Sequence, residues 1–201
     1  KPVRRPTGSY DSNILCAECD NKLGKYDLAA IKFCKRNDFE SHPSGVASLL
    51  SKVDKASLKL FALSYIWRAS ITQLSEYDMV NLGYKHESKI ANMLRNNDAG
   101  GIDDYSVIMT RFNLPEERKM WGMHVLNPTT NRLDGINIVN VYLPNLYKWI
   151  VKVDSRPFGK TMRDMSLGAM DEALILDMGE YTNSQEFSFM HDAIMKMHGN
   201  K

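Results

Sequence analysis

The feature that most constrains the fold is a change of hydrophobic period about halfway along the 201-residue chain. From Lys52 to about Thr72 the apolar residues recur at helical spacing, and Asp54 lies in the first turn, where a negative charge suits the helix dipole. So many positions of this segment are apolar that we expect it to be buried on more than one side. A second helix is expected from about Lys85 to Arg95, before an Asn-Asn-Asp-Ala-Gly-Gly breaker.

After residue 104 the pattern is that of β-strands. Four short segments are rich in β-branched and aromatic residues and are separated by turn-forming pairs such as Asp134-Gly135. These segments are residues 105–112, 120–126, 136–143 and 146–153. Because the connections between them are short, the pattern predicts an antiparallel sheet of about four strands. From about Met170 the pattern returns to helix, most clearly from Ser184 to Lys196.

The first 45 residues differ from the rest. Residues 1–12 contain two prolines, a glycine and no periodicity, which is typical of an extended arm. A helical pattern follows from Leu23 to about Phe33, and a polar loop from 35 to 45. We therefore expect an α+β fold in two parts. Residues 1–45 form a basic arm with a zinc-turn-like segment, and residues 46–201 form an α+β domain with central helices, the antiparallel sheet and a helical C-terminal tail.

The charge of the chain is unevenly distributed. The net charge is only +2, which is too balanced to indicate nucleic acid by itself. Residues 1–36, however, carry eight basic and four acidic side chains. This excess favours an anionic partner at this end of the chain, and it equally fits a solvated basic tail. The candidates for contacts with nucleic acid are Arg4, Arg5, Lys22 and Lys25.

The compartment follows from apolar runs and cysteine usage. No apolar run approaches the ~20 residues of a membrane helix, and no secretory signal pattern is present, so we expect no membrane association. Three cysteines, an odd number, do not make a disulfide framework. Reduced thiols or metal ligands fit better, and the cytoplasm is the expected compartment.

The segment richest in chemistry is Cys16-x-x-Cys19, in which a tight turn brings two thiolates close enough for one tetrahedral zinc ion. Within this chain the two further donors would be Cys34 and His42, in the spacing C-x2-C-x14-C-x7-H. The expectation is a structural zinc site at these four residues. Two alternatives stay open. The cysteines are small buried hydrophobic residues, or they are a redox pair, which is disfavoured because no strand of a βαβ unit precedes them.

A family resemblance adds to this. The stretch Ile14-Leu15-Cys16-Ala17-Glu18-Cys19-Asp20-Asn21-Lys22-Leu23-Gly24 resembles the second half of an HNH (ββα-metal) nuclease motif, which leads into a helix. Residues 60–70 also resemble a helix of uncharacterised bacterial and phage proteins that carry such a half motif. The resemblance implies a zinc ion and, where the catalytic half is present, metal-dependent cleavage of phosphodiesters.

The chain departs from the family at the residues that carry the reaction. The family's general base is a histidine before the C-x-x-C, and residues 1–15 contain no histidine. Two further cysteines of the family are also absent from these residues, and Asp20 lies where the family has its orienting Asn. A hydrolytic mechanism cannot be completed from these residues, so the catalytic residues stay unassigned.

Two hypotheses about function remain. The leading one is a nucleic-acid-associated protein of HNH-like ancestry that acts in phage–host conflict, and that is a DNA endonuclease if an upstream catalytic half exists. The rival is a non-enzymatic interaction protein, such as an inhibitor or an oligomeric scaffold. In the rival hypothesis the sheet and the methionine-rich tail bind a protein partner or a second copy of the chain.

Overall fold

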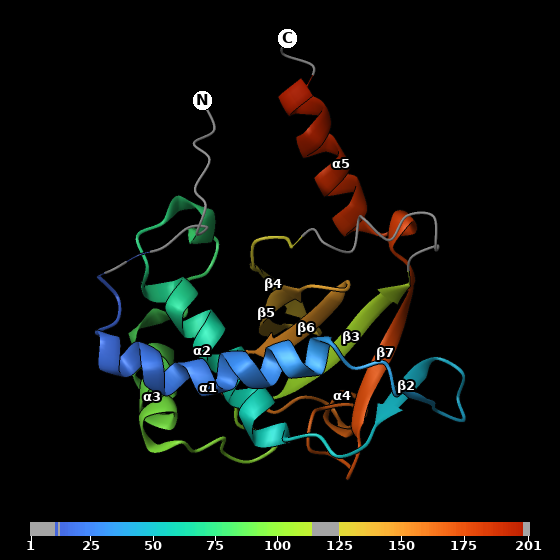
Figure 1. The fold of residues 1–201 in the computed structure, drawn as a ribbon, viewed down its shortest axis with the longest axis horizontal. Coiled ribbons are helices and arrows are strands. Elements are labelled where there is room, and N and C mark those ends of the chain that lie inside the picture. Colours follow the sequence, from blue (N-terminus) through green and yellow to red (C-terminus); the bar gives the residue numbers. More distant parts are fainter. Residues whose placement is uncertain (1–10, 12, 114–124, 199–201) are drawn as a thin grey trace.

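A mixed sheet of seven strands forms the centre of the described structure, which is a computed structural model of residues 11, 13–113 and 125–198 (Figure 1). In spatial order the strands are β1 (Glu40–Ser41), β2 (Ala47–Leu50), β7 (Ala173–Glu180), β3 (Val107–Asn113), β6 (Tyr147–Lys152), β5 (Ile136–Leu143) and β4 (Thr129–Leu133). Neighbouring strands pair antiparallel except β3 and β7, which are parallel.

Helices cover both faces of the sheet. Three long helices lie on one face: α1 (Ala17–Cys34), α2 (Lys55–Ile71) and α3 (Gly83–Asn96). The short α4 (Lys160–Asp164) packs on the opposite face, and α5 (Gln185–His198) extends away from the sheet after β7 (Figure 1). Two 3-10 turns, Ser75–Tyr77 and Tyr181–Asn183, complete the described elements. None of the helices in these ranges has the length and apolar character needed to cross a bilayer.

The main core lies between the sheet and the three long helices. Side chains of a strand alternate between its two faces, so Met109 and Trp149 point toward the helices while Ile108 and Ile150 belong to a smaller cluster under α4. Trp149 is fully buried and meets the ring of Phe33 edge-on, at 5.4 Å between centroids. It meets Phe61 of α2 in the same way at 5.8 Å. One tryptophan therefore anchors both α1 and α2 to the sheet.

Local sequence explains where the long helices begin and end. Cys16 is the N-cap of α1, and the acids Glu18 and Asp20 follow in its first turn, where they complement the helix dipole. Asp54 caps α2, and its carboxylate accepts a hydrogen bond from the amide of Ser57 at 3.0 Å. Asn97 ends α3 in a left-handed conformation with φ 54°.

Much of the predicted α+β pattern is confirmed. The helices expected at 52–72 and 85–95 correspond to α2 and α3. Three of the four expected strands correspond to β3, β5 and β6. The Asp134-Gly135 pair forms the tight β4–β5 turn, and both residues have positive φ, at 51° and 77°.

The predicted sheet was too small, and it was expected to be purely antiparallel. The sheet is mixed, β1 lies within the stretch 35–45 that was expected to be a polar loop, and β2 follows just after it. The expected strand at 120–126 lies almost entirely outside the described residues, and β4 begins just after it. Residues 173–180, expected to be helical, form β7 in the middle of the sheet. The short run Ala-Leu-Ile-Leu does not distinguish a buried strand from a helix by periodicity.

The described chain does not divide near residue 45. Leu23, Tyr26 and Phe33 of α1 belong to the same hydrophobic cluster as the strands and α2. The β1–β2 hairpin also joins the main sheet, since β2 pairs with β7. The segment expected to be a separate arm is, from α1 onward, part of the common core.

Candidate functional site

The Cys16-x-x-Cys19 pair lies at the beginning of α1. Cys16 has extended backbone angles as the N-cap, and its sulfur accepts a hydrogen bond from the amide of Cys19 at 3.4 Å. Both side chains are exposed, and both thiols are free. The amide and thiol of Cys19 hold the pKa of Cys16 below its ordinary value, and this same contact with Cys16 raises the pKa of Cys19.

The structure does not bring the four predicted zinc ligands together. Cys34 is the last residue of α1, fifteen residues after Cys19, so the two are about 22 Å apart along the helix axis. Cys34 is buried, which raises the pKa of its thiol to about 12. His42 follows β1, and its Nδ1 bonds the hydroxyl of Ser44 at 2.8 Å. Within the described ranges, no three His, Cys, Asp or Glu residues form a group suited to a metal ion.

The residues therefore do not fit a complete zinc site. A structural zinc ion takes four donors, and of the predicted set only Cys16 and Cys19 are neighbours. The length of α1 keeps Cys34 away from this pair, and His42 lies further along the chain, beyond β1.

The predicted nucleic-acid contacts fall in two places. Arg4 and Arg5 lie outside the described residues. Lys22 and Lys25 lie on exposed positions of α1. Lys22 pairs with Glu18 at 2.7 Å, whereas Lys25 donates to the side-chain oxygen of Asn97 at 2.9 Å.

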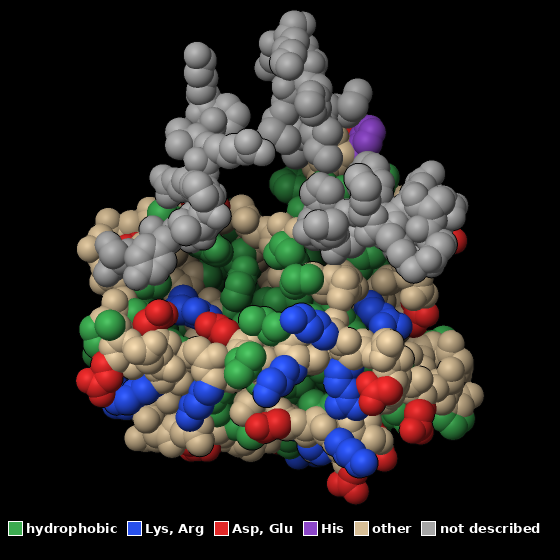
Figure 2. All heavy atoms as spheres, viewed as in Figure 1, with side chains coloured by type: hydrophobic (Ala, Val, Ile, Leu, Met, Phe, Trp, Pro, Cys, Tyr) green, Lys and Arg blue, Asp and Glu red, His purple; other side chains and the backbone are tan. Residues whose placement is uncertain are grey.

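Lys25 also belongs to a second feature, which we call the basic groove. This groove has a volume of about 450 Å³ and runs between α1 and the connection from β2 to α2. Its charged lining residues are Lys25, Lys32, Arg36, Lys52 and Asp54. Four cations thus face one carboxylate, and that carboxylate is already committed to capping α2. Figure 2 shows several Lys and Arg side chains on the face that carries α1.

The cations of the basic groove differ in how firmly they are held. Arg36 is fixed by Asp38 and by the carbonyls of Ser51 and Lys52. Lys32 and Lys52 are exposed, and their ammonium groups have no ion pair or hydrogen bond within the described part of the chain. Two lysines of the groove therefore remain available to an anion.

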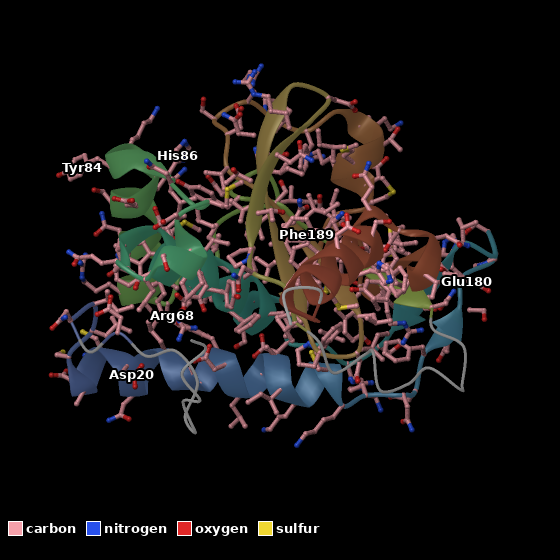
Figure 3. All side chains as sticks on the ribbon, turned by 90° about the horizontal axis from the view of Figure 1, so that it is seen from above. Asp20, Arg68, Tyr84, His86, Glu180 and Phe189 are labelled. Carbon is pink, nitrogen blue, oxygen red and sulfur yellow. The ribbon has the colours of Figure 1, made fainter. Side chains whose placement is uncertain are left out.

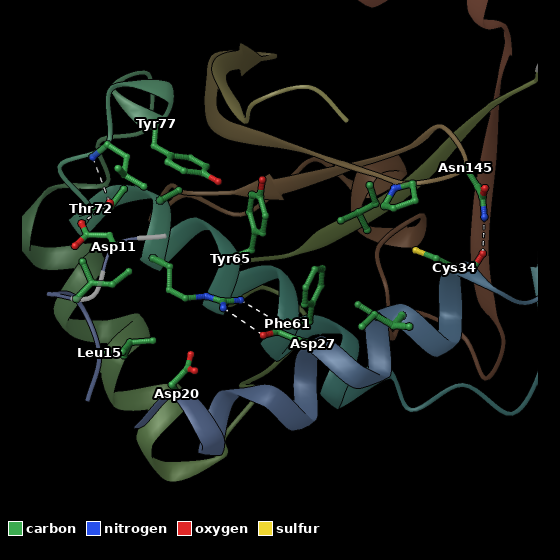
Figure 4. Close-up of a pocket in the computed structure, with 18 of the residues that line it drawn as sticks. Asp11, Leu15, Asp20, Asp27, Cys34, Phe61, Tyr65, Thr72, Tyr77 and Asn145 are labelled. Carbon is green, nitrogen blue, oxygen red and sulfur yellow. Dashed lines mark hydrogen bonds and ion pairs between the residues drawn. The ribbon is translucent and has the colours of Figure 1, made fainter. Parts of the chain in front are cut away.

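An apolar cavity of about 630 Å³ lies on the other side of α1, between this helix and α2 (Figure 4). Leu15, Ile31, Phe61, Leu143 and Pro144 supply much of its apolar wall. In Figure 2 an apolar hollow is visible between the described elements above α1. We call this space the α1–α2 cavity.

A charge pair crosses the α1–α2 cavity from one helix to the other. Arg68 of α2 donates to both carboxylate oxygens of Asp27 on α1, at 2.7 and 3.2 Å. Figure 3 shows Arg68 between the two helices. Because the two charges neutralise one another, this bidentate pair braces the helices rather than offering a free cation to a ligand. Burial raises the pKa of the neighbouring Tyr65 above its ordinary value, so this phenol is neutral at physiological pH.

Sequence reasoning missed both the basic groove and the α1–α2 cavity. Lys25, Lys32 and Arg36 are spaced by seven and four residues, which places them on one side of a helix, and this signal was present in the sequence. Lys52 joins them only because the β2–α2 connection folds back beside α1. The cavity is lined by segments more than one hundred residues apart, from Leu15 to Asn145. No local sequence pattern indicates that these segments lie side by side in the fold.

Together these features define an α+β protein with a dithiol at one helix start, a basic groove and an adjoining apolar cavity. Comparison of the chain with protein-family models, with curated proteins and with solved structures found no match.

Proposed function

We propose that this chain is a nucleic-acid-associated protein whose basic groove contacts the phosphate backbone. The observation that carries the proposal is the groove itself, whose lining holds four cations and one carboxylate. Because Asp38 neutralises Arg36, the excess positive charge comes from the three lysines. Phosphate contacts by lysine and arginine supply most of the affinity in sequence-independent binding.

The dimensions of the groove support contacts with more than one phosphate. Lys25 and Arg36 are eleven residues apart along α1 and its C-terminal end, which corresponds to about 16 Å along the helix axis. Lys52 lies on the opposite wall, so cations flank the groove on both sides. Lys32 and Lys52, which have no partner within the described residues, bind an anion without first breaking an internal contact.

The resemblance to the HNH half motif points in the same direction. The C-x-x-C itself forms the first turn of α1, whereas a tight turn followed by a helix from Leu23 was expected. The same helix forms one wall of the basic groove. The proposal concerns binding alone. Cleavage would need a general base or a bound metal ion, and the described residues do not assemble a metal site.

The test is a titration of duplex and single-stranded DNA at several salt concentrations. Binding through the groove predicts that log K falls linearly with log salt, with a slope of about −0.9 per phosphate contacted on duplex. The double variant Lys32→Gln/Lys52→Asn should reduce the slope by about 1 to 2. Asn is chosen at position 52 because Lys52 has φ 54°, a left-handed conformation that Asn tolerates.

The matched control is Lys85→Gln, which removes an exposed lysine of α3 away from the groove. This control should retain the wild-type slope. If the control reduced the slope as much per charge removed as the double variant does, binding would depend on total charge, and this would contradict a groove-based site. An affinity that does not change with salt would also contradict it.

A second candidate function, protein binding, is favoured by the α1–α2 cavity and by the exposure of Ile31 at its edge, at 51%. Light scattering of the purified chain distinguishes the two candidates. A dimer that the substitution Ile31→Ser dissociates, together with a chain that does not bind DNA, would favour the interaction protein.

A further inference from the structure

The two thiols at the start of α1 form an accessible pair. Cys16 and Cys19 are both exposed and free, whereas Cys34 is buried at the far end of the same helix. The three cysteines therefore separate into one pair that solvent reaches and one thiol that it does not. Any oxidation of the folded chain that joins two of them is confined to Cys16 and Cys19.

The backbone of the first helical turn activates Cys16. The first amides of a helix have no partner within the helix, and the amide of Cys19 donates to the sulfur of Cys16 at 3.4 Å. The interaction with Cys19 also lowers the pKa of the Cys16 thiol. Amide donors and the positive end of an 18-residue helix stabilise a thiolate at this position.

The geometry also permits the two sulfurs to be joined. Residues three apart on a helix are neighbours, with Cβ atoms about 5 to 6 Å apart, and a disulfide needs about 3.5 to 4.5 Å. Because Cys16 is the N-cap and has extended rather than helical angles, it adjusts without unwinding the helix. The lack of a preceding strand disfavours a redox pair of the βαβ type, but none of these features depends on such a strand.

We propose that Cys16 and Cys19 are a thiol–disulfide exchange site that closes reversibly to an intramolecular disulfide. This inference goes beyond the proposed function and does not rest on it. The co-reactant is a disulfide, either of a small thiol or of a protein.

The exchange proceeds in two steps. The Cys16 thiolate attacks one sulfur of R–S–S–R, so that a disulfide bond forms between Cys16 Sγ and this sulfur, the S–S bond of the co-reactant breaks and one R–S⁻ leaves. Cys19 then gives its proton to solvent or to the released thiolate and attacks the sulfur of Cys16. The Cys16–Cys19 bond forms and the second R–S⁻ leaves. Two electrons pass from the dithiol to the disulfide, which is reduced to two thiols.

The experiment equilibrates the full chain, without oxygen, in mixtures of reduced and oxidised glutathione. Acid quenching, alkylation and intact-mass analysis then count the free thiols. The expected result is one transition in which two thiols are lost together, and peptide mapping places the bond between Cys16 and Cys19. The control Cys34→Ser should show the same transition.

Single variants separate the two roles. Cys19→Ser should accumulate the mixed disulfide of Cys16 with glutathione, since the second step is blocked. In Cys16→Ser the remaining Cys19 should react at least about ten-fold more slowly than Cys16 does in Cys19→Ser. Equal rates in the two variants would contradict the assignment of Cys16 as the attacking thiol.

Metal analysis of the same preparation completes the test. A Cys16–Cys19 pair that stays reduced at every glutathione ratio would overturn the proposal. A stoichiometric metal ion that a chelator must remove before either thiol reacts would also overturn the proposal, because the two cysteines would then be metal ligands. Neither result depends on DNA binding, so failure of this proposal is distinguishable from failure of the proposed function.

Discussion

At the scale of single residues, Lys59 shows how burial changes the chemistry of a side chain. This lysine of α2 is only 5% exposed, and its ammonium donates to the carbonyl of Gly101 at 2.7 Å. Burial lowers its pKa to about 8, although the nearby charge of Asp104 acts in the opposite direction. The protonated form of Lys59 is therefore less favourable in the folded chain than in the unfolded chain.

This shift predicts a stability that rises with pH. An unfolded lysine titrates near pH 10.4, so between about pH 8 and 10 the unfolded chain binds more protons than the folded chain. The free energy of unfolding should therefore increase over this window, by about 2 kcal/mol between about pH 7.5 and 9.5 for wild type relative to Lys59→Met. Urea denaturation under reducing conditions at the two pH values measures the difference. Lys85→Met is the control and should follow wild type.

Parallel pH dependence in wild type and Lys59→Met would contradict the lowered pKa. The pKa values of Tyr105 and Tyr142 are each raised to about 12. These two tyrosines set the upper end of the pH range over which stability is expected to rise. Because tyrosines of the unfolded chain ionise first, they lower stability above about pH 10.

At the scale of elements, the packing of α1 against the sheet distinguishes a core helix from an arm. Phe33 is 3% exposed and its ring lies 5.1 Å from Tyr147 and 5.4 Å from Trp149. Leu28, five residues earlier on the same helix, is 49% exposed. The two positions therefore form a matched pair for testing this packing.

We expect Phe33→Ala to lower the free energy of unfolding by about 3 to 5 kcal/mol, because it removes a buried ring and leaves a cavity beside Trp149. Leu28→Ala should change it by less than about 0.5 kcal/mol. Urea denaturation followed by circular dichroism provides both values. Similar small effects in the two variants would mean that α1 does not contribute to the core.

The elements that sequence predicted well are those whose pattern is local. The helix at α2 and the strands β5 and β6 have long or strongly β-branched patterns with clear turns between them, such as Asp134-Gly135. β7 was missed because a buried central strand has no alternation of apolar and polar residues at its start. At the candidate site, the cysteine pair was visible from its spacing, whereas the distances of Cys34 and His42 from it depend on the length of α1.

At the scale of the whole molecule, one hydrophobic cluster includes residues from Leu23 to Ile175. Such a core predicts that the described chain unfolds as a unit rather than as an arm and a domain. Cys34 is buried in α1, so its reaction with an alkylating reagent measures whether α1 has detached from the core. In a Cys16→Ser/Cys19→Ser background, alkylation of Cys34 should begin at the same urea concentration at which the circular dichroism of the whole chain is lost.

Alkylation of Cys34 well below that concentration would show that α1 detaches before the rest unfolds. As the matched control, Cys34→Ser in the same background should take up no label at any urea concentration. This variant verifies that the signal comes from the one remaining thiol.

The position of β7 has a consequence for the order in which the chain assembles. Within the described sheet, β7 is the only link between the β1–β2 hairpin and β3, although it is the last strand to be synthesised. During synthesis the edge of β2 that pairs with β7 therefore stays unpaired until about 120 further residues have emerged from the ribosome. A chain released before residue 173 would expose two strand edges at once, and we expect it to associate with other copies through them.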